Sequence, residues 1–587
     1  MSTKYFADAA PQEEADIVIV GAGISGLYCA WRLIQDDPSR RITIIERLNR
    51  TGGRLQTDII TVRPGEVVRE EEGGMRFNYD MTELMQLNYA LGLCDDIVPF
   101  QMGSDINGAN TNRFGVRGRT FTAAQAAAGN NAIWGEIYNL DADERGLSPS
   151  DIVERVYEAV LAANGQQPPK TQSPEFWTKV RDTFQWKGSP IRDWQMWGLL
   201  RDMGYSQECV QMLSDTIGFA GPFKAAINAG DAFQILADFP EDPHYYTFER
   251  GFATLPDAVR DRLPGQVQIL LSTNVDRIVR TAAGFELTLT AAPDKQNSNP
   301  YIPGGQTKSA TCPALILAVA THGMETLFNT SPALNADPDA HRLWQSIHGA
   351  RGMSLMKINL YFEQSWWLDG AVNPPVQFGP NFSSLPINAV YPFYALSEGK
   401  AARGASALSA EEAALSGAAA LTIYCDFDNT DFWQGLQAVG EPFDSPLQRR
   451  QSVPPQTLFP ASIQVVQEAM NQLRQLFAIT NIPDPILTSY RLWDGTDDFE
   501  YAYHQWRIGV KDTETREYLA APIPGIHFCN EAISDMHGWV NGSIRSSDLV
   551  LAHFGLRPLD GPACQPPSTG HGDAAAEPVR NHGLWGA

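Results

Sequence analysis

Residues 16–54 read DIVIVGAGISGLYCAWRLIQDDPSRRITIIERLNRTGGR. This stretch has the pattern of a strand, a glycine turn, a helix and a second strand, in that order. The short β-branched run 17–20 is typical of a buried parallel strand. Gly21, Gly23 and Gly26 follow in a spacing that allows a tight turn, close approach of the backbone to a pyrophosphate, and close helix–strand packing. Glu46 ends the second strand, where a carboxylate accepts hydrogen bonds from a ribose. This order predicts a dinucleotide site; the alternative is a purely structural glycine turn.

A second glycine motif, Gly52-Gly53-Arg54, comes a few positions after this acid. A glycine pair exposes backbone N–H groups, and an arginine adds a charged fork suited to phosphate. The motif resembles the signature of the flavoprotein amine oxidase superfamily, in which the pair and the arginine lie over FAD. The alternative is a solvent-exposed turn.

Length, charge and hydropathy narrow the class of protein. A chain of 587 residues is too long for one core, so two or three domains are expected. The net charge of −24 repels phosphate backbones and anionic lipid, so we expect no nucleic-acid and no membrane partner. No uncharged apolar stretch is long enough to span a bilayer. The first residues lack a Sec-type signal, so we expect a cytoplasmic protein or one secreted by a leaderless route.

The seven cysteines are scattered, odd in number and without CxxC spacing. This pattern gives no recognisable zinc site, so no metal is expected, and it favours a reduced compartment.

The resemblance extends along most of the chain and implies a mixed α/β (α+β) fold. We expect a Rossmann-like FAD-binding domain from residues 12–78, 246–330 and 484–556. It would be interleaved with a β-sheet substrate-binding domain from 79–122 and 331–483. Residues 123–235 are mostly helical in pattern and form a candidate helical insert. The tail 557–587 is rich in Pro, Gly and His without periodicity and is expected to be disordered.

The C-terminal part supplies the second half of the predicted site. A short strand ends in Asn530-Glu531, and His537-Gly538-Trp539 then precedes a helix whose first N–H groups can meet an anion or the flavin. Two departures from the family pattern are the asparagine before Glu531, where glycine is usual, and His322 after Thr321, where proline often stands.

Three features are similar to the L-amino-acid oxidases within this superfamily. Arg76, in Gly73-Gly74-Met75-Arg76, resembles the arginine that binds a substrate carboxylate, which needs a fixed and permanently charged partner. The alternative is that Arg76 pairs with the acidic residues 70–72 or with an FAD phosphate. Tyr424 resembles a tyrosine whose hydroxyl donates to the same carboxylate, although a strand tyrosine is also typical of a core. Gly538 and Trp539 resemble the pair that accepts the substrate amine and packs beside the substrate.

The resemblance also assigns residues to the cofactor. Lys357 would lie near the flavin N5 and assist the reaction with oxygen; the alternative is a lysine that snorkels at a strand edge. No cysteine stands just before the C-terminal motif, where monoamine oxidases tether their flavin, so FAD is expected to be non-covalent. The predicted FAD contacts are Gly21, Gly23, Ser25, Gly26, Glu46, Arg47, Gly53, Arg54, Gly74, Met75, Arg76, Val275, Trp493, Glu531, Trp539 and Val540.

The implied reaction is oxidative deamination of an L-amino acid, with molecular oxygen reduced to hydrogen peroxide. The alternatives are a monoamine or polyamine oxidase, an amino-acid 2-monooxygenase, and a flavin-binding protein without turnover. Family likeness suggests a homodimer. The choice of side chain would depend on residues around 205–235, where Asp215 and Asp231 could select basic substrates or simply lie on solvated helix faces.

Overall fold

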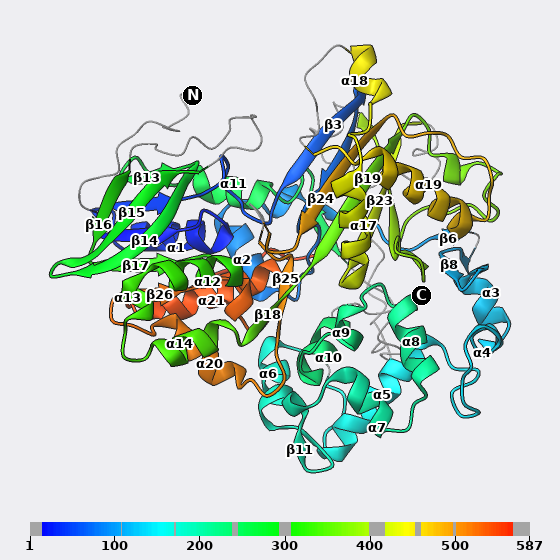
Figure 1. Cartoon of the computed structure of the whole chain (residues 1–587), viewed down its shortest axis with the longest axis horizontal. Coiled ribbons are helices and arrows are strands. Elements are labelled where there is room, and N and C mark those ends of the chain that lie inside the picture. Colours follow the sequence, from blue (N-terminus) through cyan, green and yellow to red (C-terminus); the bar gives the residue numbers. More distant parts are fainter. Residues whose placement is uncertain are drawn as a thin grey trace.

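The structure is a computed structural model that describes residues 15–106, 108–169, 172–237, 245–292, 307–397, 417–451, 459–496 and 500–566. Figure 1 shows a sheet with flanking helices at the left, a larger sheet at the upper right and a group of helices at the lower right. The predicted mixed α/β fold with a Rossmann-like sheet is confirmed.

The first sheet is parallel and is built from distant parts of the chain. Its order is β13-β2-β1-β17-β26, with bounds Val267–Leu270, Ile42–Ile45, Ile17–Val20, Ala314–Leu317 and Ile526–Phe528. Every residue of β1 and β2 is buried, as expected for a parallel sheet with both faces covered. Ile17 pairs with Ile42 on one side and with Ala314 on the other. The last strand of the chain therefore completes a sheet that the first strand began.

The turn between β1 and helix α1 (Ile24–Asp36) requires glycine at two positions. Gly21 has a φ of +104°, and a Cβ there would lie 2.5 Å from the carbonyl oxygen of Ala318, just after β17. A Cβ at Gly26 would clash with the carbonyl oxygen of Gly21. Both glycines therefore let the helix start close against the sheet.

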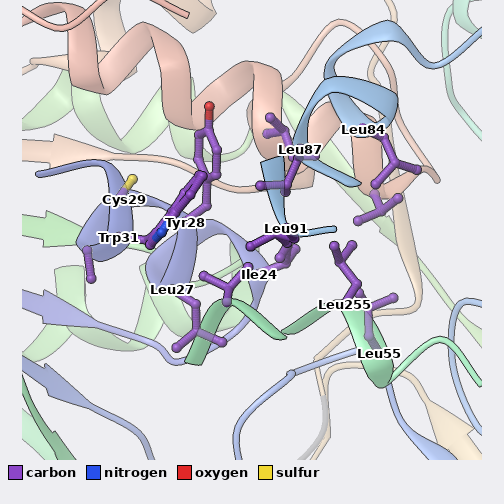
Figure 2. Close-up of a cluster of buried hydrophobic side chains, with 14 of the residues drawn as sticks. Ile24, Leu27, Tyr28, Cys29, Trp31, Leu55, Leu84, Leu87, Leu91 and Leu255 are labelled. Atoms are coloured by element: carbon purple, nitrogen blue, oxygen red, sulfur yellow. The ribbon is translucent and has the colours of Figure 1, made fainter. Parts of the chain in front are cut away.

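Helix α1 packs on helices from three other parts of the chain. Figure 2 shows Leu27 of α1 in one buried cluster with Leu87 of α2 (Thr82–Ala90) and Leu255 of α11 (Thr254–Arg260). The Tyr28 hydroxyl of α1 donates to Asp548 of α21 (Val540–Ala552) at 2.9 Å. The helix after the glycine motif is thus tied to the helix after the C-terminal motif.

The larger sheet carries several of the predicted site residues. Its order is β24-β19-β23-β21-β20-β8-β9, with bounds Leu487–Trp493, Leu355–Phe362, Ala419–Asp426, Ala389–Tyr394, Asn381–Ser383, Arg113–Val116 and Arg119–Thr122. Lys357 of β19 lies opposite Tyr424 of β23 and Arg491 of β24. Helices α17 (Asp428–Val439) and α19 (Ile463–Phe477) contribute to the core beside this sheet. The hairpin β3 (Thr57–Arg63) and β4 (Glu66–Glu71), with β22 (Leu396–Ser397) at its edge, leads into Gly73–Arg76.

A group of helices fills most of the predicted insert. These helices are α3 (Ala123–Ala128), α4 (Ala132–Ile137), α5 (Pro149–Ala163), α6 (Pro174–Thr183), α7 (Met196–Asp202), α8 (Gln207–Thr216), α9 (Gly221–Lys224) and α10 (Ala229–Ala237). Ser148, Ser173 and Ser206 cap three of them, because each hydroxyl accepts a hydrogen bond from the N–H three residues on. The domain boundaries themselves stay a prediction.

Shorter elements complete the fold. A three-stranded antiparallel sheet consists of β14 (Thr273–Thr281), β15 (Gly284–Ala291) and β16 (Lys308–Cys312). The short strand pairs are β5 (Ile97–Pro99) with β12 (Tyr246–Phe248), β6 (Asp105–Ile106) with β7 (Ala109–Asn110), β10 (Gln185–Trp186) with β11 (Ser189–Pro190), and β18 (Ala350–Met353) with β25 (Tyr503–Trp506). The other helices are α12 (Thr321–Thr330), α13 (Pro332–Asn335), α14 (Ala340–Ile347), α18 (Pro446–Gln451), α20 (Asp512–Ala520) and the 3-10 turns η1 (Cys94–Asp96), η2 (Ile191–Asp193), η4 (Trp366–Leu368) and η5 (Glu531–Ile533). In the ranges described above, no helix has both the length and the apolar character needed to cross a membrane.

One expectation is corrected near the C-terminus, and a disulfide is found there. Cys94 and Cys564 form this disulfide across a sequence separation of 470, and the compartment stays a prediction. Residues 557–566 are ordered rather than disordered: Leu559 and Ala563 pack on the core, and the N–H of Cys564 donates to the Met85 carbonyl at 3.1 Å. The rest of the expected disordered tail, 567–587, lies outside the described residues.

Candidate active site

One cavity is lined by residues that follow the carboxyl ends of four strands of the parallel sheet. Ligands of open parallel sheets bind at this edge. Its glycine part contains Gly23, Ser25, Glu46, Arg47, Gly53, Arg54, Gly74, Met75 and Glu531. Its aromatic part contains Arg76, Phe219, Ile235, Leu355, Tyr424, Trp493, Tyr503, Gly538, Trp539 and Val540. The structure therefore brings together most of the predicted site residues from both ends of the chain.

The glycine part is shaped by two turns that lie in contact. Gly23 and Gly52 form an isolated bridge, and the N–H of Gly52 donates to the Ala22 carbonyl at 2.9 Å. A Cβ on Gly53 would lie 3.2 Å from the Cα of Gly23, so side chains here would fill the space beside the exposed backbone. Such backbone is suited to cradle a pyrophosphate.

Glu46 is buried at the end of β2 and lines the same part. Its Oε2 accepts the N–H of Ala22 and its Oε1 accepts the N–H of Leu48, each at 2.8 Å. Burial raises the pKa of Glu46, although these backbone bonds oppose the shift. The carboxylate is thus positioned beside the glycine turn, where the sequence predicts a ribose contact.

Arg54 and Glu531 join the two halves of the cavity. Arg54 Nη1 donates to Glu531 Oε2 at 2.7 Å and to the Ala502 carbonyl at 3.0 Å. Glu531 also pairs with His504 Nδ1 at 2.8 Å. Burial opposes ionisation of Glu531, but Arg54 and His504 outweigh it and hold its pKa well below the usual range. Glu531 therefore remains a carboxylate at the centre of this network.

Arg76 supplies a buried cation to the aromatic part, with 5% of the residue exposed. Its guanidinium carbon lies 4.7 Å from the ring centroid of Tyr245, 5.6 Å from Phe100 and 5.9 Å from Tyr391. Stacking on aromatic rings limits the motion of a guanidinium. Arg76 Nη1 also donates to Met102 Sδ at 3.2 Å, and the side chain is hydrogen-bonded to Tyr391. This arrangement gives the cavity a fixed positive group.

Tyr424, Gly538 and Trp539 lie in the same part of the cavity. Tyr424 packs edge-on against Phe219 with ring centroids 5.8 Å apart. Burial raises the pKa of Tyr424, so its hydroxyl stays a neutral donor. Trp539 stacks on Tyr245 at 6.1 Å, and the N–H of Gly538 donates to Glu531 Oε1 at 2.7 Å.

Four predicted site residues are not among the residues that line the described cavity. Gly21 and Gly26 support the turn as described above. Val275 belongs to β14, is buried in a hydrophobic core and is absent from the described lining. Lys357 is also absent from that lining: its Nζ donates to the carbonyls of Glu71 at 2.5 Å and Gly73 at 2.7 Å. Burial lowers the pKa of Lys357 to about 8, against the influence of Glu71 and its acidic neighbours.

Several lining residues have no motif that identifies them in the sequence. They are Phe219, Ile235 and Leu355. Only the expectation that 205–235 approaches the substrate points to the first two. Asp215 and Asp231 do not line the described cavity, which corrects their suggested role in selecting basic side chains. Asp215 accepts the Tyr138 hydroxyl at 2.8 Å, and Asp231 binds the backbone of Trp506.

The chain belongs to the family of flavin-containing amine oxidoreductases, which it matches over residues 24–421 and 461–550. It is 20% identical to achacin of Lissachatina fulica over 515 residues, covering 86% of each chain. It is 27% identical to an L-amino-acid oxidase of Mus musculus over 288 residues, a match that covers 47% of this chain and only 40% of the mouse protein. The solved structure of cyclohexylamine oxidase from Brevibacterium oxydans IH-35A superposes with a TM-score of 0.57 at 17% identity, covering 92% of this chain and 98% of that one, which shows the fold alone.

The protein is therefore an FAD-dependent oxidoreductase, and the cavity fits this cofactor. The exposed glycine backbone, Glu46 and the Arg54–Glu531 pair provide the donors and acceptors that a dinucleotide needs. No cysteine occurs among the described residues of the lining, and non-covalent attachment stays a prediction. Within the described ranges, no three His, Cys, Asp or Glu side chains are grouped so that they could hold a metal ion.

Proposed function

We propose that the protein is an L-amino-acid oxidase that converts its substrate to a 2-oxo acid, ammonia and hydrogen peroxide. The observation that carries this proposal is the buried guanidinium of Arg76 in the wall of the aromatic part, beside Tyr424. A planar, permanently charged fork binds a carboxylate through two parallel hydrogen bonds. The family match supports a flavin-containing amine oxidoreductase, and the likeness to the mouse L-amino-acid oxidase supports the same activity.

In this proposal the chain acts mainly by orienting the amino acid. Arg76 and the Tyr424 hydroxyl bind the carboxylate, and the Gly538 carbonyl accepts a hydrogen bond from the amine. The Trp539 ring packs beside the substrate and limits its rotation. Bound FAD supplies the two-electron acceptor for the Cα–H bond and passes the electrons to oxygen. The substrate is thus held at its carboxylate, at its amine and by the Trp539 ring. This fixed geometry replaces a bimolecular search.

A second candidate is an oxidase for amines that lack a carboxylate. Two observations favour this candidate. One is the fold likeness to cyclohexylamine oxidase, and the other is the apolar part of the cavity lining, formed by Phe219, Ile235 and Leu355. An amino-acid 2-monooxygenase and a flavin protein without turnover are further alternatives. The products separate these: a 2-oxo acid with peroxide supports the oxidase, and a shortened amide supports the monooxygenase.

The deciding experiment compares L-amino acids, D-amino acids and the matching decarboxylated amines with the purified holoenzyme. Anaerobic bleaching of the flavin spectrum and peroxide release in air are measured for each compound. We expect bleaching by L-amino acids only, and no bleaching by any of the twenty would contradict the proposal. Arg76→Gln should lower kcat/KM for the amino acid roughly 100-fold or more, because a buried charged pair is lost. The exposed Arg449 provides the control variant Arg449→Gln.

A further inference from the structure

His537 directly precedes Gly538, and its imidazole is buried with 2% of the residue exposed. Its Nδ1 lies 3.1 Å from Asp231 Oδ2, and its Nε2 lies 3.0 Å from the carbonyl oxygen of Ala532. A carbonyl oxygen and a carboxylate oxygen only accept hydrogen bonds. A neutral imidazole has one donor nitrogen, whereas the imidazolium ion donates from both. The two contacts together therefore call for the charged ring.

The partner carboxylate is itself surrounded by donors. Asp231 Oδ2 accepts the N–H of Trp506 at 2.7 Å, and Arg181 Nη1 lies 3.6 Å from Asp231 Oδ1. The Arg181 side chain also pairs with Asp512 at 2.9 Å. An N–H donor on Oδ2 and a guanidinium beside Oδ1 both interact more favourably with a carboxylate than with a carboxylic acid. The hydrogen shared by Asp231 and His537 then belongs to the imidazole.

The charges around His537 come from every element packed on it. Asp231 lies on α10, Arg181 on α6, and Glu531 on η5, while the Trp506 ring of β25 lies 4.9 Å from the imidazole centroid. Burial alone favours the neutral ring, but Asp231 and then Glu531 outweigh burial, and the pKa of His537 is raised. The Asp535 carboxylate, two residues away, is bound by Arg545 at 2.7 Å and lies 3.6 Å from Arg516.

We infer that His537 is held as an imidazolium ion and that this ion fixes the turn carrying Gly538 and Trp539. His537 is then a positioning residue for the substrate amine. The charge assignment rests on the two acceptor oxygens beside the ring and on the charges around Asp231, and does not depend on the proposed function. The role toward the amine rests on the proposed function, because it takes the Gly538 carbonyl as the acceptor of that amine.

The turn is held at His537 and at the N–H of Gly538. His537 binds Ala532 within the turn and Asp231 on the helical group, while the Gly538 N–H binds Glu531. Loss of the second proton would place a nitrogen lone pair against an oxygen lone pair in a buried site, which is costly and leaves a polar atom unsatisfied. The ring would move, and the Gly538 carbonyl would move with it.

The charge is tested first through stability, independently of activity. A histidine whose pKa is raised on folding stabilises the protein below its unfolded value of about 6.5 and loses this effect as pH rises through the folded value. The Tm difference between the wild-type holoenzyme and His537→Gln should therefore be larger at pH 6 than at pH 9.5. His341→Gln, at an exposed position of α14, is the control. A difference that is the same at both pH values would overturn the charge assignment.

The positioning role is tested with the matched variants Asp231→Asn and Asp215→Asn, both in the helical group. We expect Asp231→Asn to raise KM for the best L-amino acid about tenfold, the loss expected from one hydrogen bond to a charged group. kcat should fall less. KM of the wild type should rise at alkaline pH, where His537 loses its proton, and in Asp231→Asn this rise should begin at a lower pH. Binding of benzoate, which has a carboxylate and no amine, should change less than about twofold. Asp215→Asn should resemble the wild type in all three measurements.

Unchanged KM and pH dependence in folded, FAD-loaded Asp231→Asn would refute the positioning role, and equal losses for benzoate and the amino acid would refute its link to the amine. If Asp231→Asn does not fold, the same KM and benzoate comparison with His537→Gln decides. If the wild type oxidises no L-amino acid, the proposed function fails, and the stability measurement still decides the charge of His537.

Discussion

Arg54 donates to Glu531 at 2.7 Å, and this contact joins two motifs that lie 477 residues apart in the sequence. The other oxygen of Glu531 accepts the N–H groups of Gly538 and His504. One carboxylate therefore fixes both an arginine of the FAD-binding part and the turn assigned to the substrate amine. Changes at Glu531 should affect the cofactor and the substrate together.

Glu531→Gln should reduce the FAD content and lower the Tm of the holoenzyme. The variant leaves Arg54 without its buried counter-charge, which typically costs about 3–5 kcal/mol. FAD per chain after gel filtration and the Tm with added FAD are the measurements. Asp444→Asn removes an exposed ion pair with Arg449 and should change neither value. Full FAD retention by Glu531→Gln would contradict this account.

Glu70→Gln should stabilise the protein more at high pH than at low pH. Burial raises the pKa of Glu70 from 4.5 to about 8, so the folded protein keeps a proton that the unfolded chain releases above pH 4.5. The wild type thus loses stability between about pH 4.5 and 8, and a glutamine removes this loss. Urea unfolding should show a gain on the order of 1–3 kcal/mol at pH 9 relative to pH 5. Glu136→Gln, at an exposed site, is the control, and equal effects at both pH values would refute the assignment.

Phe219→Ala should relax the choice of substrate side chain. Phe219 packs on Tyr424 at 5.8 Å and on Tyr503 at 6.4 Å, and its removal widens the apolar wall. A bulky apolar side chain would lose its contact with the Phe219 ring, whereas the methyl group of alanine has little contact to lose. We therefore expect kcat/KM for a bulky apolar amino acid to fall by about 10- to 100-fold relative to L-alanine. Phe432→Ala, at a position 40% exposed on α17, should leave the ratio unchanged. An unaltered ratio in Phe219→Ala would exclude this residue from the substrate wall.

Lys357→Met separates two roles for this lysine. Its Nζ binds the Glu71 and Gly73 carbonyls just before Arg76, so its loss should weaken amino-acid binding through Arg76. A role in the oxygen reaction, expected from family likeness, would instead slow reoxidation of the reduced flavin. Stopped-flow measurement of the reductive and oxidative half-reactions distinguishes them. A slower oxidative half-reaction with unchanged substrate affinity would contradict the positioning account.

The parts of the fold with strong local signals could be predicted from the sequence. The strand at 17–20, the strand at 42–45 and the glycine turn follow from a short β-branched run and from steric demands on glycine. Glu46, Arg54 and Glu531 stand at strand ends or beside glycines, so local motifs identify them. Val275 shows the limit, because a family motif places it without specifying whether the residue faces the ligand or the core.

Residues selected by packing alone could not be predicted. Phe219 and Leu355 reach the cavity because distant elements fold against each other, and apolar side chains carry no distinguishing pattern. The sequence likewise shows Asp231 only as an acidic residue of a helix. Its contacts with Arg181 and His537 depend on the tertiary structure. Cys94 and Cys564 pair across almost the whole chain, and cysteine spacing does not encode such a partner.

The disulfide between Cys94 and Cys564 makes most of the chain one closed covalent ring. A protease cut anywhere between the two cysteines opens the ring but releases no fragment. A nicked molecule would therefore run at full length on a non-reducing gel and separate into pieces only after reduction. The FAD-binding part, which contains both the first and the last strands of the parallel sheet, would stay joined even after such a cut.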